Sequence, residues 1–239
     1  METIRRNENE QAAQRIADEL SLVSRHLRIE RRVVREGDTV YQAGQSFDCL
    51  YIVNAGCFKI VNLSPDGREQ VVALHFRGDW LGLNGIASGR YGCDAIAMDT
   101  GEVWSIRYDD LVAAAAKEPA LLTVLHRAMS REILRDRESM LALCTLSADA
   151  RVADFLRYWV DQLAQRGLRT DRITLRMSRA EIGNYLGMKL ETVSRALSRL
   201  AQGDLIRFDD KCRRDIRIPR VEALSAFVAR STSPAAAVH

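Results

Sequence analysis

Residues 177–200, MSRAEIGNYLGMKLETVSRALSRL, carry the signals for two short helices that are joined by a glycine turn. Ser178 is followed three residues later by Glu181, and this capping-box spacing predicts that a helix begins there. Gly187 can adopt the left-handed conformation that ends a helix and turns the chain sharply. The second helix has one apolar face, which we expect to be buried, formed by Leu190, Val193, Leu197 and Leu200. The polar side of the second helix is therefore forced outward.

The outward side of the second helix combines one acidic residue with arginines and serines. They recur at helical spacing as Glu191, Ser194, Arg195, Ser198 and Arg199. A helix fits into the major groove of DNA, where Arg donates two hydrogen bonds to guanine and Glu accepts one from cytosine. This chemistry predicts that Glu191 and Arg195 read neighbouring base pairs. The alternative is a solvated surface on which these two residues only form an i, i+4 ion pair.

Side chains suited to phosphate contacts surround this face, and such contacts fix the register on DNA without reading sequence. We assign this role to Ser178, Arg179, Lys189, Thr192, Ser198 and Arg199, and Ser194 has the same capacity. Residues 151–220 contain 16 Lys and Arg against 9 Asp and Glu, whereas the rest of the chain contains 19 against 23. A basic segment attached to a mildly acidic remainder is typical of a domain that meets a polyanion.

Residues 32–108 differ in composition, with short segments rich in Val, Ile, Tyr and Phe between turn residues. Ten of the chain's 14 glycines lie between Gly37 and Gly101. This pattern predicts a compact β-barrel or β-roll over residues 31–118, with SPDG at residues 64–67 as a hairpin turn. Residues 1–30 are charged, with apolar positions at helical spacing, and they predict an N-terminal helical extension packed on the roll.

Residues 120–146 contain neither Gly nor Pro and predict one long helix, which we delimit as a dimerisation helix at 119–146. Its apolar positions recur at steps of three, four or seven, as expected of a helix that pairs with another helix. They are Leu122, Leu125, Met129, Ile133, Met140 and Leu143. The alternative is a helix that packs on its own β-roll.

The segment after Ser147 predicts a winged helix-turn-helix over residues 147–230. A helix is expected at residues 150–166, and the two-helix stretch comes after it. Two alternating segments, LIRF and DIRI, then flank the polar DDKCRR and predict a small hairpin. The tail over residues 231–239 is small and polar, and we expect it to be disordered. The overall expectation is an α+β chain with a β-roll, a long helix and a winged helix-turn-helix.

This order of elements resembles the CRP/FNR family of bacterial transcription regulators, and AEIGNYLGMKLETVSRALSRL resembles its FNR branch in particular. YQAG at 41, LYIVNAG at 50, GREQ at 67 and FRGDWLG at 76 extend the resemblance over nearly the whole chain. It implies a cyclic-nucleotide-binding-like β-roll, a homodimer, RNA polymerase as a partner, and double-stranded DNA with TTGAT-type inverted half-sites. It also implies that Glu191, Ser194 and Arg195 contact bases. Lys189 departs from the Thr that is common before this helix, and a lysine cannot cap it.

The resemblance leaves the sensed signal open. FNR holds an iron-sulfur cluster through N-terminal cysteines, but no cysteine precedes Cys49 here and Trp104 stands where the β-roll ligand is expected. The cyclic-AMP branch holds the phosphate with an Arg-Ser pair that is missing around Tyr91, where Arg90 is a weak substitute. Neither cofactor is therefore expected. Cys212 is a candidate redox residue, because the flanking Lys211, Arg213 and Arg214 favour its thiolate, and a constitutive regulator is also consistent with the sequence.

Other classes of protein receive less support. The sequence contains no nucleophile-base constellation, P-loop or metal-ligand spacing, so we do not expect an enzyme or a metal site. The five cysteines have no CxxC spacing, and no signal peptide or long apolar run is present, which predicts a cytoplasmic protein with reduced thiols. The main rival is a β-roll ligand- or redox-sensing module whose main partner is a protein rather than DNA.

Overall fold

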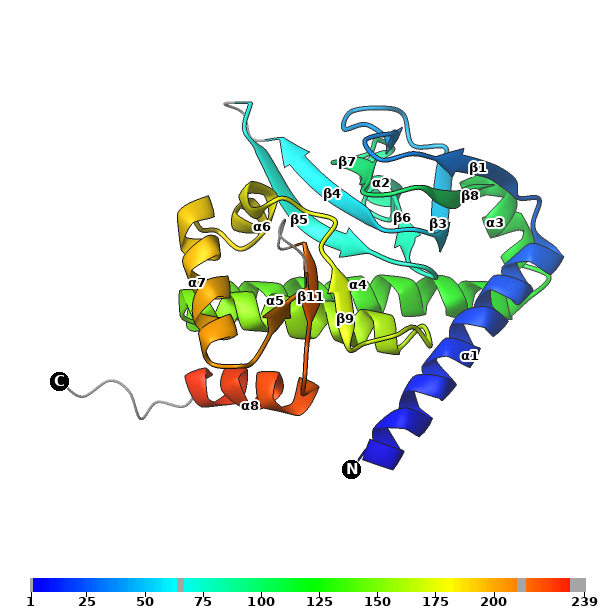
Figure 1. The fold of residues 1–239 in the computed structure, drawn as a ribbon. Helices are drawn as coiled ribbons and strands as arrows, with labels where there is room; N and C mark the ends of the chain where they lie inside the picture. The colour runs from blue at the N-terminus through cyan, green and yellow to red at the C-terminus, as the bar shows by residue number, and fades with distance from the viewer. Residues whose placement is uncertain (1, 64–66, 210–213, 233–239) are drawn as a thin grey trace. The chain divides into compact units, whose positions relative to one another are not determined.

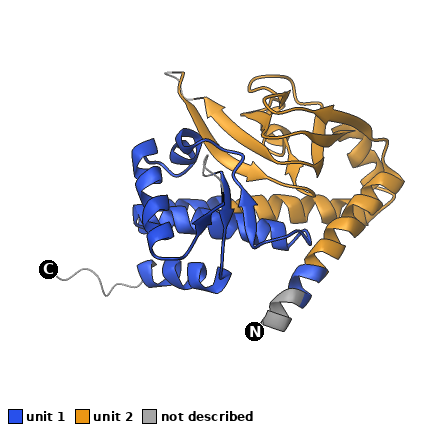
Figure 2. Ribbon diagram, in the orientation of Figure 1, with its two compact units in different colours: residues 1–10, 136–239 blue, residues 11–135 orange. Residues whose placement is uncertain are grey.

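The computed structural model describes residues 2–63, 67–209 and 214–232, and within these ranges the side chains of residues 7–231. The chain forms two compact units, one of residues 11–135 (unit 2) and one of residues 136–239 with residues 1–10 (unit 1), shown in Figure 2. The long helix α4 (Pro119–Thr145) contributes residues to both units. This division therefore falls inside the predicted dimerisation helix rather than at its ends.

Unit 2 is a β-roll of two antiparallel four-stranded sheets, accompanied by α2, α3, most of α1 and the first part of α4 (Figure 1). One sheet has the order β1-β8-β3-β6 and the other β2-β7-β4-β5. The elements are α1 (Glu2–His26), β1 (Glu30–Val34), β2 (Thr39–Tyr41), β3 (Cys49–Ala55), β4 (Phe58–Leu63), β5 (Glu69–His75), β6 (Trp80–Leu81), α2 (Gly85–Ser88), β7 (Asp94–Ala97), β8 (Gly101–Arg107) and α3 (Tyr108–Ala115). The predicted β-roll is confirmed. Of the predicted turn at residues 64–67, only Gly67 lies within the described residues, and its φ of 80° is left-handed.

Alternating side chains fill the space between the two sheets, as expected when each strand turns one face inward. Val53, Phe58, Ala95 and Val103 are fully buried in this core. The turn from β3 to β4 needs glycine, because a Cβ on Gly56, where φ is 86°, would lie 2.8 Å from an Asp99 carboxylate oxygen. The regular glycines of this region therefore mark turns between packed strands.

Helices α1 and α4 cover one side of the roll through a second apolar core. Leu20 and Val23 of α1 pack there with Leu121, Val124 and Leu125 of α4. Glu19 adds ion pairs to Arg127 and Arg131, at 3.7 and 3.2 Å. The expectation that the N-terminal extension packs on the β-roll is thus met by α1.

The position of Leu125 corrects part of the proposed dimer seam. Its side chain is only 6% exposed, because it lies on the face of α4 that packs against the roll of its own unit. Met129 is half-buried against the same core. Leu122, Ile133, Met140 and Leu143 are exposed, as are Leu134 and Leu141. The exposed apolar positions continue along α4 without the buried Leu125.

Unit 1 is a winged helix-turn-helix. Its elements after α4 are α5 (Ala148–Ala164), β9 (Arg172–Thr174), α6 (Arg179–Tyr185), α7 (Leu190–Gln202), β10 (Arg207–Phe208), β11 (Asp215–Arg217) and α8 (Val221–Thr232). The antiparallel pairing of β10 with β11 confirms the predicted hairpin, and β9 joins it as a third strand. Neither β9 nor α8 was expected. Because α8 includes residues 231 and 232, the predicted disordered tail starts too early, and residues 233–239 lie outside the described part.

Candidate nucleic-acid interface

A capping box fixes the start of α6, the first helix of the helix-turn-helix. The Ser178 hydroxyl accepts a hydrogen bond from the Glu181 backbone N–H at 3.2 Å, and the Glu181 carboxylate accepts one from the Ser178 N–H at 2.8 Å. This reciprocal pair satisfies two N–H groups that a helix start otherwise leaves open. Ser178 therefore has a structural partner in addition to its proposed phosphate role.

Two glycines shape the turn from α6 to α7. Gly187 has a φ of 63°, the left-handed conformation expected there. Gly183, which sequence reasoning missed, lies buried inside α6, and a Cβ on it would stand 2.5 Å from the Met188 carbonyl oxygen. The Met188 N–H in turn donates to the Gly183 carbonyl at 2.8 Å. A glycine in mid-helix was the available signal, because it marks a close backbone approach.

Gly183→Ala is expected to destabilise the protein although alanine favours helices. The added methyl group displaces the turn, a cost of about 1–3 kcal/mol that outweighs roughly 1 kcal/mol of helix propensity. Gly203→Ala is the matched control, because its Cβ would lie an ordinary 3.5 Å from the Arg199 carbonyl oxygen. Thermal unfolding of both variants measures the effect. Equal melting temperatures for the two would refute the close-approach explanation.

The buried face of α7 is formed by Val193, Ala196, Leu197 and Leu200. Leu190 was expected on this face but is 44% exposed, because it is the first residue of the helix. The expectation for Leu190 is therefore wrong, and Ala196 is part of the buried face instead. Packing of this face sets which side of α7 meets solvent.

Glu191 and Arg195 lie exposed on the opposite side, one turn apart. The Arg195 side chain donates from Nε to the Glu191 backbone carbonyl at 3.3 Å. Within the described residues the two side chains form no ion pair with each other, so their charged ends face solvent. Ser194 is half-buried beside them. This side thus presents one carboxylate and one guanidinium at a spacing suited to neighbouring base pairs.

The proposed phosphate contacts fall into two groups. Lys189 is exposed at the N-cap of α7 and makes no capping hydrogen bond with its side chain, as expected for a lysine. Thr192 is half-buried, and the Ser198 hydroxyl donates to the Ser194 carbonyl at 3.0 Å. Arg179 and Arg199 have partners inside the protein instead. The Arg179 guanidinium lies 6.0 Å from the Phe208 ring centroid. The Arg199 guanidinium donates to the Asp149 carboxylate from Nε and from one terminal nitrogen.

The wing sheet is held by paired charges. The Thr174 hydroxyl donates to Asp215 at 2.6 Å, which lowers the pKa of that carboxyl, and Arg172 donates to it at 3.2 Å. Arg217 of β11 pairs with Asp209, the residue directly after β10, at 3.2 Å. Cys212, the candidate redox residue, belongs to the segment 210–213, which lies outside the described residues.

The side chains inside the β-roll show whether a cyclic nucleotide could bind there. Tyr91 stands in the segment where the resemblance to the cyclic-AMP branch implies a phosphate site, and its ring stacks on Tyr41 with centroids 4.1 Å apart. Its hydroxyl donates to the Cys49 carbonyl at 2.7 Å. Burial raises the pKa of Tyr91, so this hydroxyl carries no charge. The stacked rings of Tyr41 and Tyr91 thus occupy the place where the phosphate of a cyclic nucleotide would need hydrogen-bond donors.

The neighbours of Tyr91 do not supply an anion site either. Cys93 is buried, accepts a hydrogen bond from the Asn84 amide at 2.8 Å, and has a pKa raised by burial. The exposed Arg90 donates to the Gly44 carbonyl at 2.7 Å. A buried phosphodiester needs cationic or N–H donors around it. The side chains around Tyr91 therefore do not fit a cyclic nucleotide.

The donors for an iron-sulfur cluster are scattered. The described cysteines, 49, 57, 93 and 144, lie on separate segments. Within the described residues, no three His, Cys, Asp or Glu side chains gather closely enough to hold a metal ion. Trp104 is buried and donates from its indole nitrogen to Glu102 at 2.7 Å. A four-ligand cluster does not fit this set of donors.

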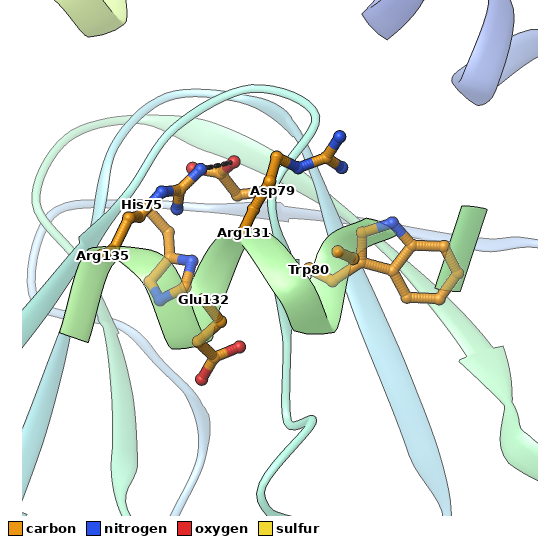
Figure 3. Close-up of a pocket in the computed structure, with 7 residues that line it drawn as sticks. His75, Asp79, Trp80, Arg131, Glu132 and Arg135 are labelled. Atoms are coloured by element: carbon orange, nitrogen blue, oxygen red, sulfur yellow. Dashed lines mark hydrogen bonds and ion pairs between the residues drawn. The ribbon is translucent and has the colours of Figure 1, made fainter. Parts of the chain in front are cut away.

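A small polar hollow lies in unit 2 beside α4 (Figure 3). Its central feature is the ion pair of Asp79 with Arg135, at 2.7 Å, and Asp79 also accepts a hydrogen bond from the Phe76 N–H at 2.9 Å. Because Asp79 is 5% exposed, this pair ties the turn before β6 to α4 from inside. The hollow is therefore part of the packing of α4 on the roll.

Comparisons with known proteins agree with both units. The family model of the cyclic nucleotide-binding domain matches residues 31–118, and the Crp-like helix-turn-helix domain matches residues 150–227. The chain is 37% identical over 180 residues to the transcriptional activator protein Anr of Pseudomonas protegens, covering 75% of this chain and 74% of Anr. It is 33% identical over 208 residues to the fumarate and nitrate reduction regulatory protein of Salmonella typhimurium, covering 87% and 82%.

The structure of FixK2 from Bradyrhizobium japonicum matches with a TM-score of 0.73 and 29% identity, over 84% of this chain and 97% of FixK2. No helix in the described residues has the length and apolar character needed to cross a membrane. The β-roll, the long helix and the winged helix-turn-helix occur in the order shared by these regulators. The chain belongs to the CRP/FNR family of bacterial transcription regulators.

Proposed function

We propose that this protein is a homodimeric transcription factor that binds an FNR-type inverted repeat, TTGAT-N4-ATCAA, by inserting α7 into the major groove. The observation that carries this proposal is the exposed pair of Glu191 and Arg195 on α7. Arg195 donates to guanine O6 and N7, and Glu191 accepts from cytosine N4. Ser194 lies between them on the same side. Lys189 at the helix start neutralises a phosphate.

Two copies bind together through α4. Its exposed apolar side chains, Leu122, Ile133, Met140 and Leu143, support a helix pair, because such a stripe is costly to leave in water. A two-fold symmetric dimer places its two α7 helices about one helical turn apart on DNA. RNA polymerase is the partner at the promoter. The protein binds DNA without an iron-sulfur cluster or cyclic AMP, because the side chains that the structure describes suit neither group.

Changing the spacing of the half-sites tests the dimer and the DNA together. Inserting five base pairs, to give TTGAT-N9-ATCAA, moves one half-site to the opposite face of the duplex. The dimer then reaches only one half-site, and we expect affinity to fall on the order of 100-fold. Fluorescence anisotropy at fixed salt measures both duplexes and a scrambled duplex of equal composition. Equal binding to all three would overturn the proposed function.

A further inference from the structure

The first turn of α5 contacts both ends of the turn-helix segment that carries the reading side chains. Asp149 lies in this first turn, and Arg199 of α7 donates to it from Nε at 2.6 Å and from a second nitrogen. The hydrogen bond to Asp149 raises the pKa of the Arg199 guanidinium. Such a two-pronged pair fixes the direction of the guanidinium as well as its position.

Arg151, two residues further along α5, holds the other end. It donates from Nε to the Leu146 carbonyl at 3.0 Å and from a terminal nitrogen to the Leu186 carbonyl at 3.2 Å. Leu186 is the C-cap of α6, immediately before Gly187, and carbonyls at a helix end lack partners within the helix. Leu146 comes directly after the last residue of α4. One side chain thus joins the end of α4 to the start of the turn.

We propose that Asp149 and Arg151 are positioning residues for DNA recognition, acting as a bracket that sets the rotation of α7; this proposal rests on the proposed function. Arg199 lies one turn after Arg195 on α7. Because Asp149 holds Arg199 from the side of α5, it also fixes the direction in which Arg195 points. Arg151 fixes the point at which the chain enters the turn. The segment is thus held before the turn at Leu186 and near the end of α7 at Arg199, which restricts tilt and rotation of α7 to the precision that base reading requires.

The bracket reassigns Arg199. Its guanidinium is engaged by Asp149 and is therefore a brace, whereas its position on the surface had suggested a phosphate contact. The two roles predict opposite changes in DNA affinity for Asp149→Asn. If Arg199 held a phosphate, removing the Asp149 charge would free it and strengthen binding to a polyanion. If the bracket positions α7, the same change weakens binding although it removes a negative charge.

Anisotropy titrations of the full-length protein with TTGAT-N4-ATCAA compare wild type, Asp149→Asn, Arg199→Gln and the double variant. We expect Asp149→Asn to weaken binding about fivefold per half-site, and so about 25-fold for the dimer. Arg199→Gln should do the same, and the double variant should lose no more than either single one. The dependence of log Kd on log salt should keep its slope, whereas loss of a phosphate contact in each subunit lowers it by about 1.8.

Two further variants complete the test. Asp154→Asn removes the same charge from α5, but Asp154 pairs with Arg157 on its own helix, so DNA binding should not weaken. Arg151→Lys keeps the charge, but a single ammonium group cannot donate to the Leu146 and Leu186 carbonyls together as the guanidinium does. DNA binding should therefore weaken, with an unchanged slope of log Kd against log salt. Tighter binding by Asp149→Asn, additive losses in the double variant, or a reduced salt slope for Arg199→Gln would overturn the bracket.

Hydrogen exchange of the free protein separates this proposal from the function on which it rests. Asp149→Asn should speed amide exchange in α7 and in the α6–α7 turn, and Asp154→Asn should not. Unchanged exchange in Asp149→Asn contradicts the bracket whether or not DNA binds. A wild-type protein that does not prefer TTGAT-N4-ATCAA to the scrambled duplex contradicts the proposed function instead.

Discussion

Met140→Glu is expected to convert the proposed dimer into monomers and to weaken binding to TTGAT-N4-ATCAA by at least about 100-fold. Each subunit then places a carboxylate in the apolar seam, where the two like charges face each other and lose water. A monomer holds only one half-site, so the advantage of binding two linked sites disappears. Sedimentation equilibrium measures the dimer, and anisotropy measures the affinity.

Leu141→Glu is the matched control for this change. Leu141 neighbours Met140 on α4 and is equally exposed, at 63% against 62%, but it points about 100° away around the helix. The seam predicted from the sequence includes Met140 and excludes Leu141. We therefore expect Leu141→Glu to remain a dimer. If Leu141→Glu dissociates and Met140→Glu does not, the register of the seam is wrong.

Arg195→Ala is expected to reduce affinity for the cognate duplex by about 1–3 kcal/mol per half-site, and to relax the preference for the base that Arg195 reads. The loss arises from two hydrogen bonds to a single guanine. Lys189→Ala removes a phosphate contact instead. It should weaken binding to all duplexes alike and reduce the salt slope by about 1 per half-site. Identical behaviour of the two variants would contradict the division between base reading and phosphate contact.

The helix-turn-helix was predictable because its signals are local. Ser178 and Glu181 lie three residues apart, and Gly187 needs only its own φ to end the turn. Gly183 was missed because its role depends on the Met188 carbonyl, which approaches only after the chain has turned. Leu190 was placed on the buried face because helical spacing alone does not show where a neighbouring helix stops covering it.

The β-roll was predictable as a class but not as a pairing scheme. Its short segments of Val, Ile, Tyr and Phe, separated by glycines, indicate many short strands between turns. The pairing of β1 with β8, in which Glu30 lies opposite Ser105, joins segments about 75 residues apart, and local patterns do not encode it. Strand β9 has three residues, too few for an alternating pattern to be distinctive. Only the assembled sheet identifies it.

Long-range partners also explain what the sequence does not show at individual sites. An apolar heptad position and a core position look the same in sequence, and only the packing of α4 on the roll separates Leu125 from the exposed seam. Arg199 has the spacing of a DNA-facing residue, and the structure adds a partner that the spacing does not show, Asp149, which lies 50 residues away in the chain. Charge and spacing locate a surface, but the partners of each side chain decide its role.

A double-mutant cycle between protein and DNA tests the central claim that α7 reads bases through Arg195. Anisotropy titrations compare wild type and Arg195→Ala on TTGAT-N4-ATCAA and on a duplex whose third base pair in each half-site is changed from G·C to A·T. We expect the change to cost wild type about 1–3 kcal/mol per half-site, and to cost Arg195→Ala almost nothing. If Arg195→Ala discriminates between the two duplexes as strongly as wild type does, Arg195 does not read that base pair.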